Sequence, residues 1–228
     1  MKQIILIAAL VLAAQLTAFN ATADTADVTE ARAIVDQAGT TFSKFVADKE
    51  FTIFREHLKK AKALLIIPRV LKAGFVWGGS GGDGVLVVKS EQTGEWSQPA
   101  FYTVGSVSFG LQIGAQEAEV IMLAMSQKAI DTLFASSFKF GGDISVAVGP
   151  QGVGAKKIVT ADFVSFAKAK GLYAGLNFEG SGVHVRDDLN KAYYNRDVRP
   201  IEIIMQKEVS NPHSAKLLSA LREGMSSF

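Results

Sequence analysis

Residues 61–88, AKALLIIPRVLKAGFVWGGSGGDGVLVV, contain the point at which the chain changes from a helical to an extended pattern. Upstream, over residues 24–62, apolar side chains recur at spacings of three or four, which is typical of amphipathic helices, and a second helix is predicted at about residues 51–63. Inside the stretch, residues 64–67 form a short apolar run that ends at Pro68, and glycine, valine and phenylalanine predominate further on. The sequence therefore predicts helices first and a sheet from about residue 64.

The rest of the chain alternates strand-like and helix-like segments. The clearest strand pattern covers residues 100–116, where Phe101, Val107 and Phe109 occupy odd positions and polar residues occupy even ones. Further segments are a strand at 119–125, a helix at 126–134 capped by Ser126, a strand at 139–148, a hairpin at 163–172 centred on Lys170-Gly171 with its returning arm at 172–179, and helices at 189–194, 200–205 and 212–221. This order predicts an α+β fold: a twisted, mostly antiparallel sheet or partly closed β-barrel flanked by N-terminal and C-terminal helices.

The N-terminus has the features of an export signal. Met1-Lys2 precedes an apolar run over residues 4–14, and Ala21-Thr22-Ala23 is a small-x-small site that suits signal peptidase. We expect cleavage after Ala23 and a periplasmic or secreted protein, because the apolar run is too short for a membrane anchor. The mature chain would then be one domain, made of a helical segment at 24–63 and a β-rich core with C-terminal helices at 64–228.

Composition excludes several classes of protein. The 228 residues are 48% hydrophobic and 20% charged with a formal net charge of +2, which indicates neither a disordered chain nor a nucleic-acid-binding one. The chain has no cysteine, so it has no disulfides, thiol nucleophiles or thiolate metal sites. Its three histidines, His57, His184 and His213, are far apart in sequence, and no carboxylate cluster has metal-ligand spacing. We therefore predict no cofactor and no metal.

The glycine-rich segment at residues 78–84 matches two catalytic patterns. It contains G-x-S-x-G around Ser80, as in serine hydrolases, and G-x-G-x-x-G, as in dinucleotide-binding folds. Both patterns require a helix directly after the glycines, whereas the residues that follow, 85–88, are strand-like. We interpret the segment as the tip of a hairpin in which Asp83-Gly84 is the favoured turn dipeptide, with Gly78 to Gly82 allowing positive φ or close backbone packing. A hydrolase built on Ser80 is the least favoured of three hypotheses.

A basic segment precedes the glycines. Its cations, interleaved with apolar side chains and accompanied by a single acid, Glu56, are Arg55, Lys59, Lys60, Lys62, Arg69 and Lys72. An ordinary amphipathic helix with a solvated lysine face would give the same pattern. If the segment meets anionic lipid instead, each basic residue near the surface contributes about 1 kcal/mol, which is enough in sum for reversible adsorption.

Several longer blocks resemble the SYLF (Ysc84-type) domain family. They are the opening stretch, GEWSQPAFYTVGSVSFGLQIGAQEAEVIMLAM, FKFGGDISVAVGPQGVGA, KGLYAGLNFEGSGV and NKAYYN, and together they span about residues 50–225. The resemblance implies a non-enzymatic lipid-binding module, with phosphoinositide binding and, in eukaryotic relatives, actin binding. It also implies that lipid contact involves a basic amphipathic segment, for which the candidates here are Lys59, Lys60, Lys62, Arg69 and Lys72.

The leading hypothesis is thus an exported protein that associates reversibly with anionic lipid or a membrane surface, without bond chemistry. The alternative is an envelope interaction scaffold that binds a protein or polysaccharide partner through the same basic residues. Neither hypothesis involves nucleic acid, and no particular protein partner is predicted.

Overall fold

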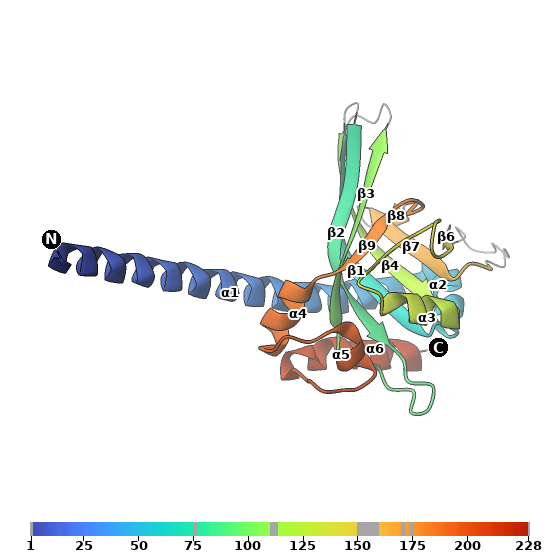
Figure 1. Ribbon diagram of the computed structural model, residues 1–228. Helices are drawn as coiled ribbons and strands as arrows, with labels where there is room; N and C mark the ends of the chain where they lie inside the picture. Colours follow the sequence, from blue (N-terminus) through green and yellow to red (C-terminus); the bar gives the residue numbers. More distant parts are fainter. Residues whose placement is uncertain are drawn as a thin grey trace.

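A computed structural model of the chain describes residues 2–74, 77–109, 114–149, 160–169, 172–173 and 176–227 (Figure 1). Its helices are α1 (Lys2–Ala47), η1 (Lys49–Phe51), α2 (Thr52–Leu58), α3 (Gln127–Leu133), α4 (Asp187–Tyr194), α5 (Pro200–Ile204), η2 (Pro212–Ser214) and α6 (Ala215–Ser226). Its strands are β1 (Ala63–Gly74), β2 (Trp77–Val88), β3 (Ala100–Phe109), β4 (Gly114–Ala124), β5 (Ser137–Lys139), β6 (Val146–Val148), β7 (Phe163–Ala169), β8 (Leu172–Tyr173) and β9 (Gly182–Val185).

The strands form one nine-stranded sheet. Its order is β5-β9-β3-β2-β1-β4-β7-β6, with β8 paired to β7, and only the β6–β7 pair is parallel among the described strands. Helices lie before the sheet in sequence and again after it, so the predicted α+β class with a mostly antiparallel sheet is confirmed. The predicted change of structure near residue 64 is also confirmed, because β1 begins at Ala63.

Both faces of the sheet are covered, which explains the continuous apolar run at the start of β1. Leu64 and Ile66 face a core built with α1, α2, α4 and α6. Leu65 and Ile67 face a second core on the opposite side, where α3 and α5 supply Ile130, Leu133, Ile203 and Ile204. Successive side chains point to opposite faces of a strand, so an alternating pattern disappears when both faces are apolar.

α1 and α6 pack closely along the first core (Figure 1). Small residues permit this approach: a Cβ on Gly39 would lie 3.4 Å from the Cα of Leu217, and one on Gly224 would lie 2.5 Å from the ring of Phe42. The first side chain of α1 buried in this core, within the described side chains, is Ala31. Across the residues described, none of the helices has the length and apolar character needed to cross a membrane.

The glycine-rich segment is not a hairpin tip, and that prediction is wrong. Residues 78–84 lie inside β2 and pair with β3 throughout, from Gly78↔Ser108 to Gly84↔Tyr102. The glycines are required instead by close contact with β1, whose register shifts around Pro68 in a β-bulge. A Cβ on Gly82 would lie 2.2 Å from the carbonyl oxygen of Arg69, and one on Gly84 would lie 2.4 Å from that of Ile66. Pro68 does not end the strand either, because β1 continues to Gly74 beyond the bulge.

Two other predicted strands are each divided. The strand predicted at 100–116 is β3, which ends at Phe109, followed by β4, which begins at Gly114 and also includes the strand predicted at 119–125. The strand predicted at 139–148 is β5 and β6, separated by a turn in which Gly141 has a φ of +79°. Apolar and polar residues can keep alternating from the end of one strand into the next. The alternation in sequence therefore did not show where each strand ends.

Most remaining elements agree with their predictions, but the helix predicted at about residues 51–63 is α2, which ends at Leu58. α3 is capped as expected, since Ser126 Oγ accepts a hydrogen bond from the amide of Ala129 at 3.1 Å. β7 and β8 pair in antiparallel fashion on either side of Lys170-Gly171, a dipeptide that itself lies outside the described residues. The returning arm is shorter than predicted, because β8 is Leu172–Tyr173 and residues 176–179 are not in a strand. The C-terminal helices appear as α4, α5, η2 and α6.

Candidate functional site

Arg55, the first of the six predicted basic residues, is engaged inside the helical segment. Its guanidinium donates hydrogen bonds to the carbonyl oxygens of Val46 at 3.1 Å, Asp48 at 2.5 Å and Lys49 at 3.4 Å, and to Thr52 Oγ1 at 3.1 Å. These carbonyls lie at the end of α1 and in the link to α2, where helical partners run out. Arg55 therefore fastens α2 to the end of α1.

The next three predicted residues lie where α2 leads into β1. Lys59 and Lys60 are exposed, and Lys62 is half-buried and forms an ion pair with Glu91. The start of β1 pairs with the end of β2, so the amide of Lys89 donates to the carbonyl of Lys62 at 2.8 Å. Lys59, Lys60, Lys62 and Lys89 are called the junction patch below. Sequence reasoning missed Lys89, because only strand pairing brings it to this position.

The last two predicted residues lie elsewhere. Arg69 is at the bulge of β1 and pairs with Glu117 of β4, with Nε and Oε2 3.0 Å apart. Lys72 lies further along β1, opposite Ser80 on one side and Gln116 on the other. Because a strand rises about 3.3 Å per residue, Lys72 lies about 30 Å from Lys62. The structure thus does not bring the six residues into one surface.

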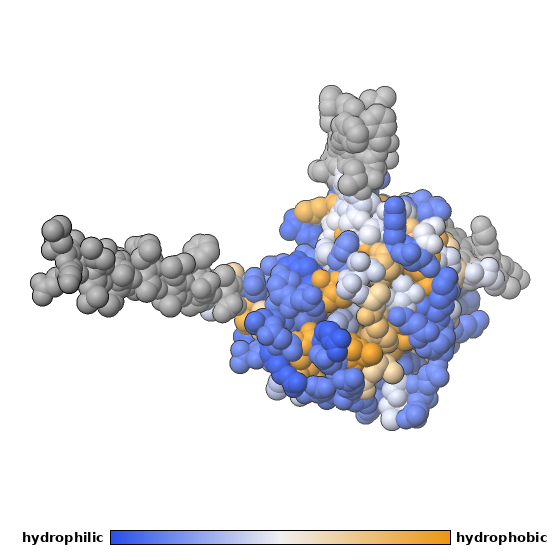
Figure 2. Space-filling view, in the orientation of Figure 1, coloured by the Kyte–Doolittle hydropathy of each residue, from blue (hydrophilic) through white to orange (hydrophobic). Residues whose placement is uncertain are grey.

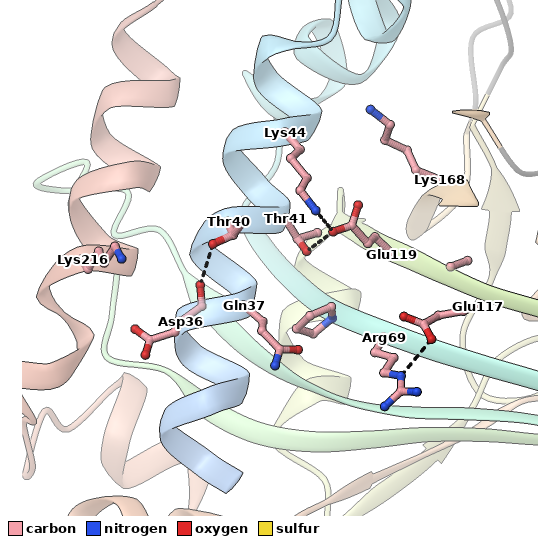
Figure 3. Close-up of a pocket in the computed structure, with 12 residues that line it drawn as sticks. Asp36, Gln37, Thr40, Thr41, Lys44, Arg69, Glu117, Glu119, Lys168 and Lys216 are labelled. Atoms are coloured by element: carbon pink, nitrogen blue, oxygen red, sulfur yellow. Dashed lines mark hydrogen bonds and ion pairs between the residues drawn. The ribbon is translucent and has the colours of Figure 1, made fainter. Parts of the chain in front are cut away.

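A polar pocket of about 650 Å³ lies between α1, α6 and the bulge of β1 (Figure 3). It is lined by Asp36, Gln37, Thr40, Thr41, Lys44, Pro68, Arg69, Glu117, Ala118, Glu119, Lys168 and Lys216. Of these, four are cationic and three are acidic, so the walls carry nearly balanced charge. Arg69 is the one predicted basic residue among them.

The charges of the polar pocket are mostly paired. Glu119 accepts from Lys44 Nζ at 2.7 Å and from Thr41 Oγ1 at 3.0 Å, as Figure 3 shows. Lys168 is only 9% exposed, and its ammonium lies 2.5 Å from the carboxylate of Asp48 and 5.3 Å from the ring centre of Phe51. These pairs join α1 and its following link to β4 and β7. The polar pocket is therefore chiefly a set of interelement ion pairs.

A second depression, the groove, has a volume of about 720 Å³ and lies between the 89–98 loop, α3 and the end of α5. It is lined by Lys62, Val88, Lys89, Ser90, Glu91, Gln92, Glu95, Trp96, Ser97, Gln98, Gln127, Ile130, Ile203, Ile204, Met205, Lys207, Val209 and Ser210. Lys62 and Lys89 also belong to the junction patch, so the patch borders the groove. Volumes of this size are typical of small-ligand sites.

The groove combines an apolar floor with cations. Ile130 and Ile204 are buried beneath it, while Met205 is 59% exposed at its edge. Lys62 is neutralised by Glu91, but Lys89 and Lys207 make no ion pair with any residue that the structure describes. Such an arrangement can bind an anionic or amphipathic ligand without bond chemistry.

The catalytic patterns have no supporting geometry. Ser80 Oγ lies 2.8 Å from Ser106 Oγ of the adjacent strand, and β2 continues through the glycines without a helix. His57, His184 and His213 lie in α2, β9 and η2 respectively. No group of three potential metal-ligating side chains occurs within the described ranges. This arrangement gives the hydrolase hypothesis no support.

The groups with perturbed pKa values belong to structural networks. Hydrogen bonds from Arg186 lower the pKa of Asp188, and the same guanidinium lies 2.8 Å from Asp83, which ties β2 to the start of α4. Burial raises the pKa of Tyr102, whose hydroxyl donates to the carbonyl of Leu133. Hydrogen bonds from Ser126 and Ser145 lower the pKa of Asp162.

Comparisons with known proteins agree with a binding module. The family model Ysc84, described as "Las17-binding protein actin regulator", matches residues 105–224. SH3 domain-containing protein PJ696.02 of Schizosaccharomyces pombe is 34% identical over 165 residues, which are 69% of this chain and 38% of that protein. Protein YSC84 of Saccharomyces cerevisiae is 31% identical over 173 residues, 73% of this chain and 36% of that protein.

A human relative gives a similar result. SH3 domain-containing YSC84-like protein 1 is 30% identical over 152 residues, which are 64% of this chain and 44% of the human protein. The chain thus spans less than half the length of each of these three relatives. The similarity concerns one shared segment of longer proteins.

Proposed function

Because the chain belongs to the Ysc84 (SYLF) family, we propose that it is a non-catalytic binding module that adsorbs reversibly to anionic lipid surfaces through its junction patch. The observation that carries the proposal is the grouping of Lys59, Lys60, Lys62 and Lys89 where α2 meets the sheet, with Glu91 as the ion-pair partner of Lys62. Lys59 and Lys62 are three positions apart, which is at most about 11 Å of chain. The cations are thus close enough to contact one surface together.

The strength of this contact follows from the number of cations. Each lysine near an anionic membrane contributes about 1 kcal/mol, so four give a few kcal/mol at most, reduced by the Glu91 pair. Adsorption of this strength is reversible and is weakened by salt, because the Debye length falls from about 10 Å at 0.1 M to about 3 Å at 1 M. Arg69 and Lys72 stay predicted lipid-binding residues. Because they lie further along β1, they would contact lipid through a part of the surface separate from the junction patch.

We also propose export with cleavage after Ala23. In the described part of α1 the buried core residues begin at Ala31, so the cleavage would remove none of the described core contacts. N-terminal sequencing of the protein recovered from its native cells tests this. An intact N-terminus on all of the protein contradicts it.

A protein partner is the second candidate function. The family description names Las17 binding and actin regulation, and the Schizosaccharomyces pombe and human relatives carry SH3 domains by name. Lysines of the junction patch would serve an acidic protein surface as well as a lipid surface. Such a partner would be captured in detergent, where vesicles are absent.

Co-sedimentation with vesicles tests the lipid proposal. The purified protein is mixed with neutral vesicles or with vesicles containing an anionic phospholipid, at low and at high salt. We expect sedimentation with the anionic vesicles at low salt alone. The double variant Lys59→Glu/Lys60→Glu should abolish it, while Lys216→Glu, an exposed lysine of α6 at the polar pocket, should not. Absence of sedimentation with both vesicle types contradicts the proposal.

A further inference from the structure

The groove beside the junction patch has the properties of a site for one acyl chain. We propose that it binds a monomeric, single-chain amphiphile with an anionic headgroup, such as a long-chain fatty acid. The inference rests on the proposed function for one point, the negative charge of the headgroup. It requires no membrane, because a single molecule fills the groove.

The apolar part of the site comes from three elements. Val88 is at the end of β2, Ile130 is in α3, and Ile204 and Met205 are at the end of α5. Met205 is the most exposed large apolar side chain in the described part of the chain. In Figure 2 an apolar area lies over the region of α5 and is bordered by hydrophilic residues. Methionine adapts its shape to flexible ligands, which suits an acyl chain.

The cationic part comes from Lys89 and Lys207. Neither has an ion-pair partner within the described ranges, whereas Glu91, one of the two acids of the groove, is already paired with Lys62. The other acid, Glu95, also lines a neighbouring depression of about 380 Å³ and so lies where the two meet. A carboxylate headgroup placed between Lys89 and Lys207 would give both lysines a partner.

The loop that carries Met205 and Lys207 is held in place before any ligand binds. Lys207 has a φ of +55°, a left-handed conformation that is unfavourable for a long side chain. Backbone hydrogen bonds maintain it: Gln206 donates to Ile201 at 3.1 Å, and Glu208 donates to Glu202 at 3.0 Å. Strained conformations that surrounding contacts enforce are often found at ligand sites.

The groove can also accommodate a long chain. The neighbouring depression shares Glu95, Trp96, Gln98 and Ser210 with it, so the two depressions adjoin at these residues. Each of the two volumes lies within the range of small-ligand pockets. A bilayer surface is too broad to enter a depression of about 720 Å³, whereas one extended acyl chain can enter it.

Tryptophan fluorescence tests the inference. The chain has two tryptophans, Trp77 and Trp96, so the full-length Trp77→Phe variant reports on the groove alone. Decanoate, laurate and myristate are titrated below their critical micelle concentrations. We expect a saturable change, with the dissociation constant falling about three- to fourfold for each added methylene that is buried. Lys207→Glu should raise the dissociation constant at least fivefold, and Lys216→Glu should leave it unchanged.

Met205→Ser provides a second variant in the same Trp77→Phe background. Its side chain is largely exposed, so the substitution should not affect folding, yet it should weaken laurate binding severalfold. A blank titration, or an affinity that does not depend on chain length, overturns the inference even if vesicles bind. Saturation by fatty acids together with failed vesicle sedimentation supports the inference and contradicts the proposed function.

Discussion

The polar pocket and the groove have similar volumes and both contain lysines, but their charges have different surroundings. In the polar pocket, Lys44, Arg69 and Lys168 each have a carboxylate partner on another element. In the groove, Lys89 and Lys207 have none within the described residues, and the floor beside them is apolar. Lysines in a depression therefore indicate a ligand site only when the fold itself leaves their charge unpaired.

This difference predicts that charges of the polar pocket stabilise the fold, whereas charges of the groove serve binding. Substitutions in the two places should accordingly separate stability from affinity.

The largest effect is expected for Asp48→Ala. It leaves the ammonium of Lys168 buried without its carboxylate, and loss of one partner of a buried pair costs about 3 kcal/mol or more. Urea denaturation should show this loss in the free energy of unfolding, with laurate affinity unchanged in the folded protein. Lys44→Met is the matched control, because the Lys44 side chain is 53% exposed and Glu119 keeps its hydrogen bond from Thr41, so stability should change by less than about 1 kcal/mol. If Asp48→Ala and Lys44→Met lower the free energy of unfolding equally, the Lys168–Asp48 pair is not the more stabilising of the two.

The second effect concerns the contact between β2 and β1 beside the bulge that carries Pro68 and Arg69 of the polar pocket. Gly84→Ala places a Cβ 2.4 Å from the carbonyl oxygen of Ile66, so β1 and β2 must separate. We expect a loss of about 2 kcal/mol in unfolding free energy, as for other overpacked sites. Gly105→Ala in the neighbouring β3 is the control, since its nearest contact is 3.9 Å and its φ is not positive. A stable Gly84→Ala protein would mean that the glycine serves chain flexibility instead.

These glycines also mark the limit of what the sequence predicted. The helices, the change to a sheet near residue 64 and the cap of α3 follow from local periodicity and capping, and they are confirmed. The role of Gly82 and Gly84 depends on the bulge at Pro68, which lies on another strand. A run of glycines reads locally as a turn. Close backbone packing was an open alternative for Gly78 to Gly82, but the local sequence does not indicate which strand approaches them.

The candidate site shows the same limit. Lys59, Lys60 and Lys62 were found because they are neighbours in sequence, and the family resemblance was recognised from whole blocks and is confirmed. Lys89 and Lys207 were not found, because strand pairing and the α5 loop bring them to the groove from distant parts of the chain. The positions of lysines and arginines in the sequence do not show which of them form ion pairs in the folded protein.

The third effect tests the groove directly. Lys89→Glu should weaken laurate binding about five- to tenfold, close to 1 kcal/mol, because it replaces attraction of the headgroup by repulsion. The free energy of unfolding should change by less than about 0.5 kcal/mol, since this lysine has no ion pair to lose within the described residues. Arg69→Glu, at the polar pocket, is the control for affinity. If it weakens laurate binding as much as Lys89→Glu does, long-range charge explains the binding and the groove does not.

The smallest effect concerns the helix that forms one wall of the groove. Asp162 accepts hydrogen bonds from Ser126 Oγ and Ser145 Oγ, both at 2.6 Å, and Ser126 in turn caps α3, which carries Ile130. Because these bonds lower the pKa of Asp162, the ionised carboxylate stabilises the folded state above its unfolded pKa of about 4. This contribution disappears as the pH falls through the lower, folded pKa.

Asp162→Asn should therefore reduce the free energy of unfolding by less than about 1 kcal/mol at pH 7. The difference between this variant and the wild type should shrink as the pH falls below about 4. Urea denaturation between pH 3 and pH 7 measures it, and Asp143→Asn, whose carboxylate accepts from the amide of Lys139 in the β5–β6 turn, is a control that does not touch α3. A difference that grows on acidification has the wrong sign for a carboxylate with a lowered pKa. Such a result would remove Asp162 as the group that holds the α3 wall of the groove.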